Sequence, residues 1–207
     1  MSHWLTLTLA LLVAWGLGWL GLSRGKRRMR PILERLAEET GGEVVSPGFI
    51  YLPKLLFNYG AVSVELTSAF ASDSSEGGSS TPYTSVLFRE VALSAFRFRI
   101  LPHPLSKRSL RGSGMRRLAT EESIYDDLFI YTNDEAIMQA VLDAYAEVAT
   151  RVKLSDKAYH RIFDIRNDDG KLIYAVETML TSYEAYRTLL ASATQFLDAV
   201  QRTRPSA

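Results

Sequence analysis

Two neighbouring carboxylates and two histidines are the side chains in this sequence best suited to acid–base chemistry. Asp126 and Asp127 stand directly before the apolar run LFIY at 128–131, while His103 and His160 lie elsewhere in the chain. A carboxylate and a histidine within hydrogen-bond reach of one substrate could transfer protons in a hydrolytic reaction. Adjacent residues on a strand point to opposite faces, so Asp126 and Asp127 would not act as a pair. The alternative interpretation is a charged strand entrance that pairs with the arginines before it.

Other common catalytic and metal-binding patterns are missing from the sequence. There is no cysteine, which excludes disulfides, thiolate metal ligands and cysteine nucleophiles. The three histidines do not form the H-E-x-x-H pattern of zinc enzymes. The stretch GLSRGK at 21–26 is one residue short of a phosphate-binding loop, and no G-x-S-x-G nucleophile elbow occurs. We therefore expect no cofactor and no metal.

The first residues have the pattern of a membrane anchor. Residues 4–22 carry no charge, and as a helix they would extend about 28 Å, close to the thickness of a bilayer's hydrocarbon core. Trp4 and Trp19 lie near the two ends, where indole rings favour the membrane interface. The rival interpretation is a cleaved signal peptide, which would need a basic start and a small-residue cleavage site. We predict an uncleaved transmembrane anchor at 1–23.

Basic residues set the expected orientation and a membrane-facing surface. A first cluster follows the apolar stretch and a second lies in the irregular segment 101–118. Basic residues beside a span tend to stay cytoplasmic, so we expect a single pass through the inner (plasma) membrane, with the N-terminus outside and the domain in the cytoplasm. Both clusters could contact the anionic inner leaflet, although the second could instead neutralise the acidic run at 121–127. The predicted membrane-surface residues are Arg24, Lys26, Arg27, Arg28, Arg30, Lys107, Arg108, Arg111, Arg116 and Arg117.

The expected partners are the lipid bilayer and a protein that the sequence does not identify. Ala10, Ala14 and Gly18 recur every fourth residue, a spacing that lets two spans approach closely, so a homodimer through this face is one interpretation. The alternative is that small residues are simply common in membrane spans. The net charge is +1 and segment 101–118 has no aromatic residue for base stacking, so we expect no nucleic acid.

The remaining chain reads as one α+β domain with a mainly antiparallel sheet and two or three packed helices. A basic stop and helical stalk is expected at 24–42, with Pro31 at the first helical position and Gly41–Gly42 ending the helix. The globular domain is expected at 43–207. Apolar and polar residues alternate in 61–70 and 94–101, which predicts half-buried strands. NDDG at 167–170 predicts a hairpin turn within 159–178.

Two helices are expected near the C-terminal half of the domain. Thr132 and Thr181 would cap them, because each is followed three residues later by a glutamate, Glu135 or Glu184, as in a capping box. Between the first strands, the polar low-complexity stretch at 71–82 is expected to be a loop inserted in a hairpin.

The stretches EETGGEVVSPGFIYLP, FRFRILP and IYDDLFIYTND carry a resemblance to known sequences. With them, the chain resembles a loose group of uncharacterised bacterial single-span membrane proteins that have a β-rich domain. The resemblance implies no activity and no site. We therefore favour a membrane-tethered cytoplasmic interaction or regulatory module without catalytic activity. The alternatives are a membrane-anchored hydrolase that uses a carboxylate and a histidine, and a lipid-binding β domain.

Overall fold

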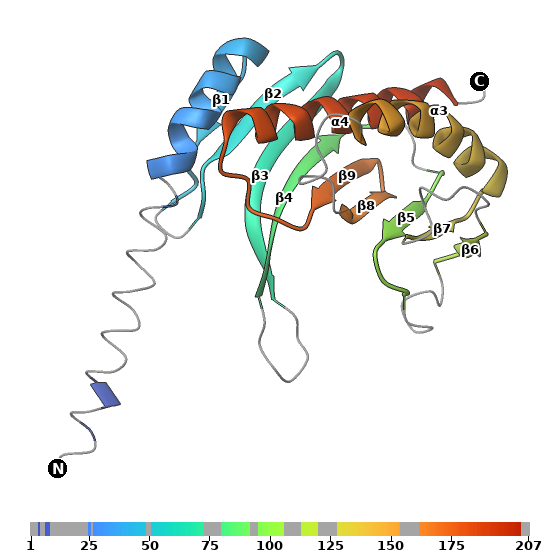
Figure 1. The fold of residues 1–207 in the computed structure, drawn as a ribbon, viewed down its shortest axis with the longest axis horizontal. Helices are drawn as coiled ribbons and strands as arrows, with labels where there is room; N and C mark the ends of the chain where they lie inside the picture. The colour runs from blue at the N-terminus through green and yellow to red at the C-terminus, as the bar shows by residue number, and fades with distance from the viewer. Residues whose placement is uncertain are drawn as a thin grey trace.

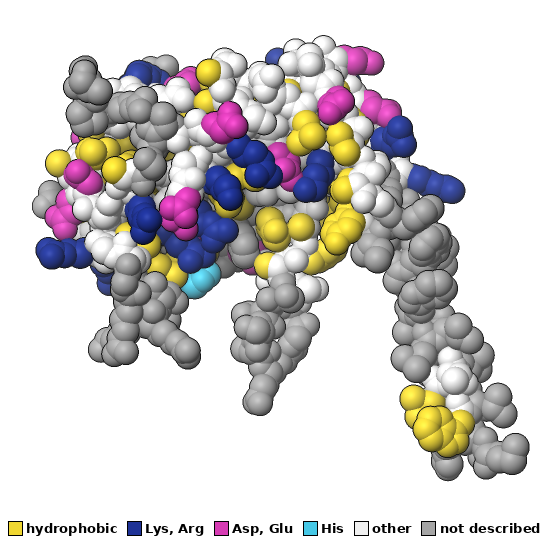
Figure 2. All heavy atoms as spheres, turned by 180° about the vertical axis from the view of Figure 1, so that it is seen from behind, with side chains coloured by type: hydrophobic (Ala, Val, Ile, Leu, Met, Phe, Trp, Pro, Cys, Tyr) yellow, Lys and Arg dark blue, Asp and Glu magenta, His cyan; other side chains and the backbone are white. Residues whose placement is uncertain are grey.

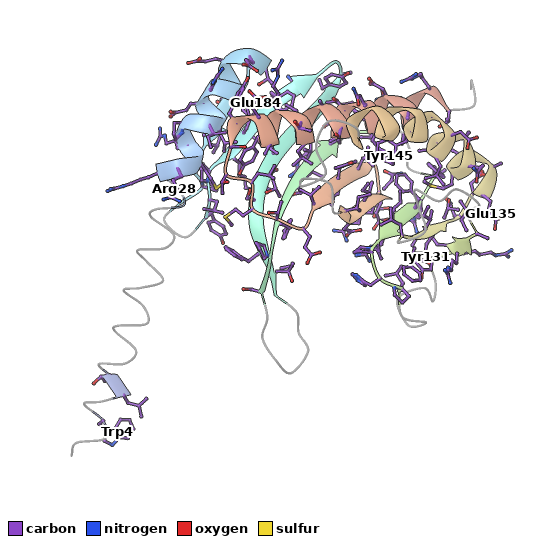
Figure 3. The ribbon with its side chains drawn as sticks, viewed as in Figure 1. Trp4, Arg28, Tyr131, Glu135, Tyr145 and Glu184 are labelled. Carbon is purple, nitrogen blue, oxygen red and sulfur yellow. The ribbon has the colours of Figure 1, made fainter. Side chains whose placement is uncertain are left out.

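The structure is a computed structural model in which most of the domain is described. It describes residues 4, 7–8, 25, 27–48, 51–72, 80–91, 95–105, 113–119, 128–153 and 162–203, with the backbone alone for 72, 146–153 and 163. The predicted anchor at 1–23 therefore lies outside the described residues except at Trp4, Leu7 and Thr8. The first two of these side chains are exposed, at 79% and 58%. Trp4 lies apart from the sheet and its helices (Figure 3).

Nine strands form one antiparallel sheet within the described part of the chain (Figure 1). In chain order they are β1 (Glu43–Val45), β2 (Lys54–Tyr59), β3 (Val62–Ser72), β4 (Ser80–Arg89), β5 (Phe98–Leu101), β6 (Arg116–Leu118), β7 (Phe129–Thr132), β8 (Ile162–Asp168) and β9 (Lys171–Val176). Across the sheet the order is β1-β2-β3-β4-β9-β8-β5-β7-β6. The expected α+β class with an antiparallel sheet is confirmed.

Both predicted hairpins are present. β3 and β4 pair from Ser63 opposite Arg89 to Ser72 opposite Ser80, so regular pairing extends into the predicted loop 71–82 from both sides. β8 and β9 are joined through Asp169 and Gly170, which have φ values of 48° and 72°. Two consecutive positive φ values are what a tight two-residue hairpin turn requires, and glycine adopts them without steric cost.

Three helices cover one face of the sheet: helix 27–40, α3 (Glu135–Lys153) and α4 (Tyr183–Arg202). Figure 1 shows α3 and α4 crossing the sheet on the same side. Phe196 of α4 lies at the centre of the core, with ring centroids 5.9 Å from Phe98, 4.9 Å from Tyr145 and 5.9 Å from Tyr174. These contacts join both C-terminal helices to the middle strands of the sheet.

Helix 27–40 occupies much of the segment expected to be a stalk, and it is packed into the domain. Its apolar face belongs to the same core cluster as the sheet, with three side chains that are 0–3% exposed: Met29, Leu33 and Leu36. Burying such side chains contributes about 1.5–3 kcal/mol each relative to leaving them in water. The helix is therefore a part of the core.

The ends of this helix agree only in part with the sequence pattern. Residues 27–30 are already helical, so Pro31 lies within the helix and not at its first position. At the other end, Gly41 has a φ of +67° and the Gly42 N–H donates to the Ala37 carbonyl oxygen at 2.9 Å. This is the left-handed termination in which glycine ends a helix, as predicted.

The caps of the two C-terminal helices lie slightly later in the chain than the sequence pattern suggested. Thr132 is the last residue of β7, and Asp134 caps α3 by accepting from the Ile137 N–H at 3.0 Å. In the same way Ser182, not the threonine before it, caps α4 by accepting from the Ala185 N–H. The predicted threonine caps were wrong because side chains nearer the helices supply the acceptors.

Candidate functional site

The sheet face turned away from the helices carries two groups of paired charges, and we call it the outer face. Along each strand one residue enters the core and the next belongs to the outer face, so strand register decides which outer residues become neighbours. Figure 2 shows this side of the molecule, where basic and acidic side chains are interspersed with apolar ones. Cross-strand neighbours on this face form a row over six adjacent strands. From β2 to β5 across the sheet, the row contains Leu56, Glu65, Leu87, Ile173, Arg166 and Arg99.

The first charged group on this face is the Glu65 triad, formed by Lys54 of β2, Glu65 of β3 and Arg89 of β4. The Glu65 carboxylate accepts from Lys54 Nζ at 2.5 Å and from Arg89 Nη2 at 2.8 Å. Burial by itself raises the pKa of Glu65, but the hydrogen bonds from Lys54 and Arg89 outweigh it, so the pKa is lowered. Glu65 is thus held ionised between two cations.

The second charged group is the Asp164 triad, formed by Arg99 of β5 with Asp164 and Arg166 of β8. Arg99 binds the Asp164 carboxylate with two hydrogen bonds, from Nε and Nη2, both of 3.0 Å. Arg166 Nη1 lies 3.4 Å from the same carboxylate. Such fork-like pairing fixes the guanidinium plane and is stronger than a single neutral hydrogen bond.

The two triads share one arrangement in which the carboxylate is recessed and the cations reach outward. The carboxylate side chains are 11% and 10% exposed, whereas the four cationic side chains are 30–46% exposed. Each triad has two positive charges and one negative charge, so each has a net charge of +1. The outer face therefore presents positive charge to solvent at two fixed places.

Residues of the predicted membrane surface are described at five positions. Arg27, Arg28 and Arg30 are exposed on helix 27–40, and Arg28 is labelled near its start in Figure 3. Arg116 and Arg117 are exposed on β6, where the Arg117 guanidinium lies 4.8 Å from the centre of the Phe129 ring. The other five lie outside the described residues: Arg24, Lys26, Lys107, Arg108 and Arg111.

Of the acid–base candidates only His103 is described, and it is exposed in the loop after β5. Asp126, Asp127 and His160 lie outside the described residues, as do the small residues of the predicted dimer face, Ala10, Ala14 and Gly18. Within the described residues no group of three or more histidine, aspartate or glutamate side chains is placed to hold a metal ion.

A hollow of about 350 Å³ lies beside β1 and β2. Its lining is Gly41, Gly42, Glu43, Leu56, Phe57, Asn58 and Ser63. Glu43 is the one titratable group among these lining residues, so the hollow offers no acid–base pair. Its polar lining also differs from the apolar cavity that a lipid-binding β domain would need.

Buried hydroxyl groups form a separate polar cluster inside the core. Ser68 Oγ lies 2.9 Å from Thr84 Oγ1 and 3.0 Å from the Tyr186 hydroxyl, while Thr84 donates to the Thr178 carbonyl oxygen at 2.8 Å. Burial raises the pKa of Tyr186. Because these groups satisfy one another, the cluster joins α4 to the sheet and leaves no hydroxyl directed at solvent.

The two triads were not predicted from the sequence. A signal was available, since the polar positions of the alternating stretches SVELTS, FRFRI and FDIRND hold charged residues where serine or threonine would also suit a solvent-facing strand. What the alternation could not supply was the strand order that brings Arg99 beside Asp164 and Glu65 between Lys54 and Arg89.

None of the helices that the structure describes combines the length and the apolar character needed to span a bilayer. No protein-family model matches this chain, and comparisons with curated proteins and with solved structures gave no match.

Proposed function

We propose that this protein is a single-pass membrane protein whose cytoplasmic domain binds another protein without a catalytic step of its own. The proposal starts from the charge-free stretch 4–22 and the basic residues directly behind it. Such a stretch favours lipid over water, and basic residues behind it favour the cytoplasmic side. The exposed indole of Trp4 suits a membrane interface.

The observation that carries the proposal is that helix 27–40, which follows this stretch in the sequence, is packed into the domain. The described part of the helix begins within the basic cluster and buries Met29, Leu33 and Leu36 in the core. Arg35 lies 3.9 Å from the centre of the Tyr183 ring, and the Tyr183 hydroxyl donates to Glu39, so α4 also holds the helix. A domain attached in this way would keep one orientation relative to its anchor.

Exposed arginines on the same helix support a position close to the leaflet. Arg27, Arg28 and Arg30 are exposed while Met29 between them is buried, so one helix turn faces both the core and solvent. Near an anionic surface each such charge contributes about 1 kcal/mol. The outer face, which carries fixed charges and no covering helix among the described elements, then remains available for a partner.

Reporter fusions at the C-terminus test the topology. Green fluorescent protein at this position should fluoresce, and alkaline phosphatase, which is active only outside the cytoplasm, should be inactive. The matched variant replaces Arg24, Lys26, Arg27 and Arg28 with glutamine and should raise phosphatase activity, since it removes the charges that hold the domain inside. An active phosphatase on the unmodified chain, or a protein released from membranes by alkaline carbonate, would overturn the proposal.

A further inference from the structure

The positions of the two triads define a binding surface of limited size on the outer face. Glu65 is on β3 and Asp164 on β8, with β4 and β9 between them. At a strand spacing of about 4.8 Å, three steps separate the carboxylates of the two triads by about 14 Å across the strands. At the nearby β8–β9 turn, Arg97 and Lys171 are balanced in number by Asp168 and Asp169, so this turn adds no net charge beside the triads.

Apolar side chains lie on the outer face between the triads. Leu87 of β4 and Ile173 of β9 are direct cross-strand partners on the outer face, and both are half-buried. In the same row Leu87 is next to Glu65 and Ile173 is next to Arg166. The surface is therefore cationic at both ends and apolar in the middle, and its complement is an amphipathic segment with acidic residues on both sides of an apolar centre.

The shape of the sheet favours a peptide segment over a bilayer as the occupant. Neighbouring strands twist by about 20–25°, so the sheet normal turns by about 60–75° from β3 to β8. A flat leaflet that meets one triad would be turned away from the other, whereas a short helix or strand can follow the twist. A leaflet surface also presents headgroups, not apolar side chains, to Leu87 and Ile173.

We infer that the outer face is the docking site of the partner protein, and that it binds an acidic amphipathic segment across β3, β4, β9 and β8. The inference rests on the proposed function in taking the domain as an interaction module. Carboxylates of the segment contact the outward cations of the triads, Lys54 and Arg89 at one end and Arg99 and Arg166 at the other. Apolar side chains of the segment cover Leu87 and Ile173.

Peptide selection on the full-length protein in a non-ionic detergent tests this inference directly. The probe is a displayed library of random peptides of about 16 residues, which can span the two triads as a helix or a strand. The selected peptides should contain acidic residues on both sides of an apolar centre. Selected peptides without acidic residues, or a selection that enriches nothing, would overturn the inference.

Variants then locate the binding. Arg89→Gln with Arg166→Gln should weaken binding of the selected peptide about tenfold or more, because both ends lose a charge partner. The matched control, Arg28→Gln with Arg30→Gln, removes the same charge from helix 27–40 and should leave the affinity unchanged. Ile173→Thr keeps a β-branched residue in the strand and should weaken binding about threefold to tenfold, because it removes apolar contact area. This single variant tests the same surface if the double variant does not fold.

Two further outcomes count against the inference. The first is equal affinity of the peptide for the unmodified protein and both outer-face variants. The second is that the double variant Arg89→Gln with Arg166→Gln loses binding to phosphatidylglycerol vesicles but still binds the peptide. This result would assign the outer face to lipid. Because the selection is done in detergent, its result does not depend on the topology measured by the reporter fusions, and the two failures are distinguishable.

Discussion

Replacing Glu65 with glutamine removes the charge at the centre of one triad and preserves the shape of the side chain. At pH 7 the carboxylate accepts from Lys54 Nζ and Arg89 Nη2, and its side chain is 11% exposed. A hydrogen bond to a charged group contributes about 1.5–3 kcal/mol when buried, and an exposed ion pair about 0–1 kcal/mol. The two cations remain 34% and 46% exposed, so water can solvate them after the change.

The expected loss therefore lies between these limits, at about 1–2 kcal/mol of unfolding free energy. For a protein of this size the melting temperature should fall by about 2–8 °C. The three tryptophans are Trp4, Trp15 and Trp19, all within the predicted anchor, so tryptophan fluorescence would not report on the domain. Far-UV circular dichroism of the full chain in a non-ionic detergent follows the sheet and helices instead.

The pH dependence gives the sharper test. The pKa of Glu65 is lowered on folding, so its contribution is fully present above the ordinary glutamate pKa of about 4.3 and is lost as pH falls through the lowered value. The difference between the unmodified protein and Glu65→Gln should be constant above about pH 5.5 and should shrink below about pH 4.

The matched control is Glu34→Gln, which breaks a pair with Arg30 whose side chains are 49% and 63% exposed. Its effect should stay below about 0.5 kcal/mol. A Glu65→Gln protein that is as stable as the unmodified one at pH 7, or a difference that persists unchanged at low pH, would refute the reasoning.

Three other substitutions have expected effects on stability, each measured by urea denaturation of the full chain. Gly42→Ala should cost about 1–3 kcal/mol, because its Cβ would lie 2.5 Å from the Leu56 carbonyl oxygen; unchanged stability would show that β2 can move away. Asp134→Ala should cost about 1 kcal/mol through loss of the α3 cap to the Ile137 N–H, and a neutral result would place the cap elsewhere. Ser192→Ala should be neutral or slightly stabilising, since the buried hydroxyl finds no partner among the described residues; a clear loss of stability would reveal one.

Features that depend on local sequence were predicted well. The alternation in 61–70 became β3, and the positive φ values of Asp169 and Gly170 match the turn expected from NDDG. The glycine that ends helix 27–40 was likewise predicted, because a left-handed residue at a helix end is a local requirement. The caps were displaced by one or two residues, since several nearby side chains can accept the same hydrogen bond and packing decides between them.

Features that depend on distant residues were not predictable. Nothing in the sequence placed β9 beside β4, a pairing that joins Leu87 to Ile173. The burial of Leu33 in the core was also not predictable, because it depends on α4 and the sheet packing against this helix. The Asp164 triad joins β5 to β8, which lie far apart in the chain. The Glu65 triad uses three consecutive strands, but its charges too became a site only when the register was known.

The position of the last hairpin has a consequence for synthesis of the chain. Among the described strands β8 and β9 are the last to be made, yet they lie between β4 and β5 in the middle of the sheet. Until residue 176 has left the ribosome, β4 and β5 each have an unpaired edge, and unpaired edges can join to other chains. A nascent chain that stalls before this hairpin would contain two separate, incomplete parts of the sheet. Aggregation of the truncated chain would then be detected before any loss of binding.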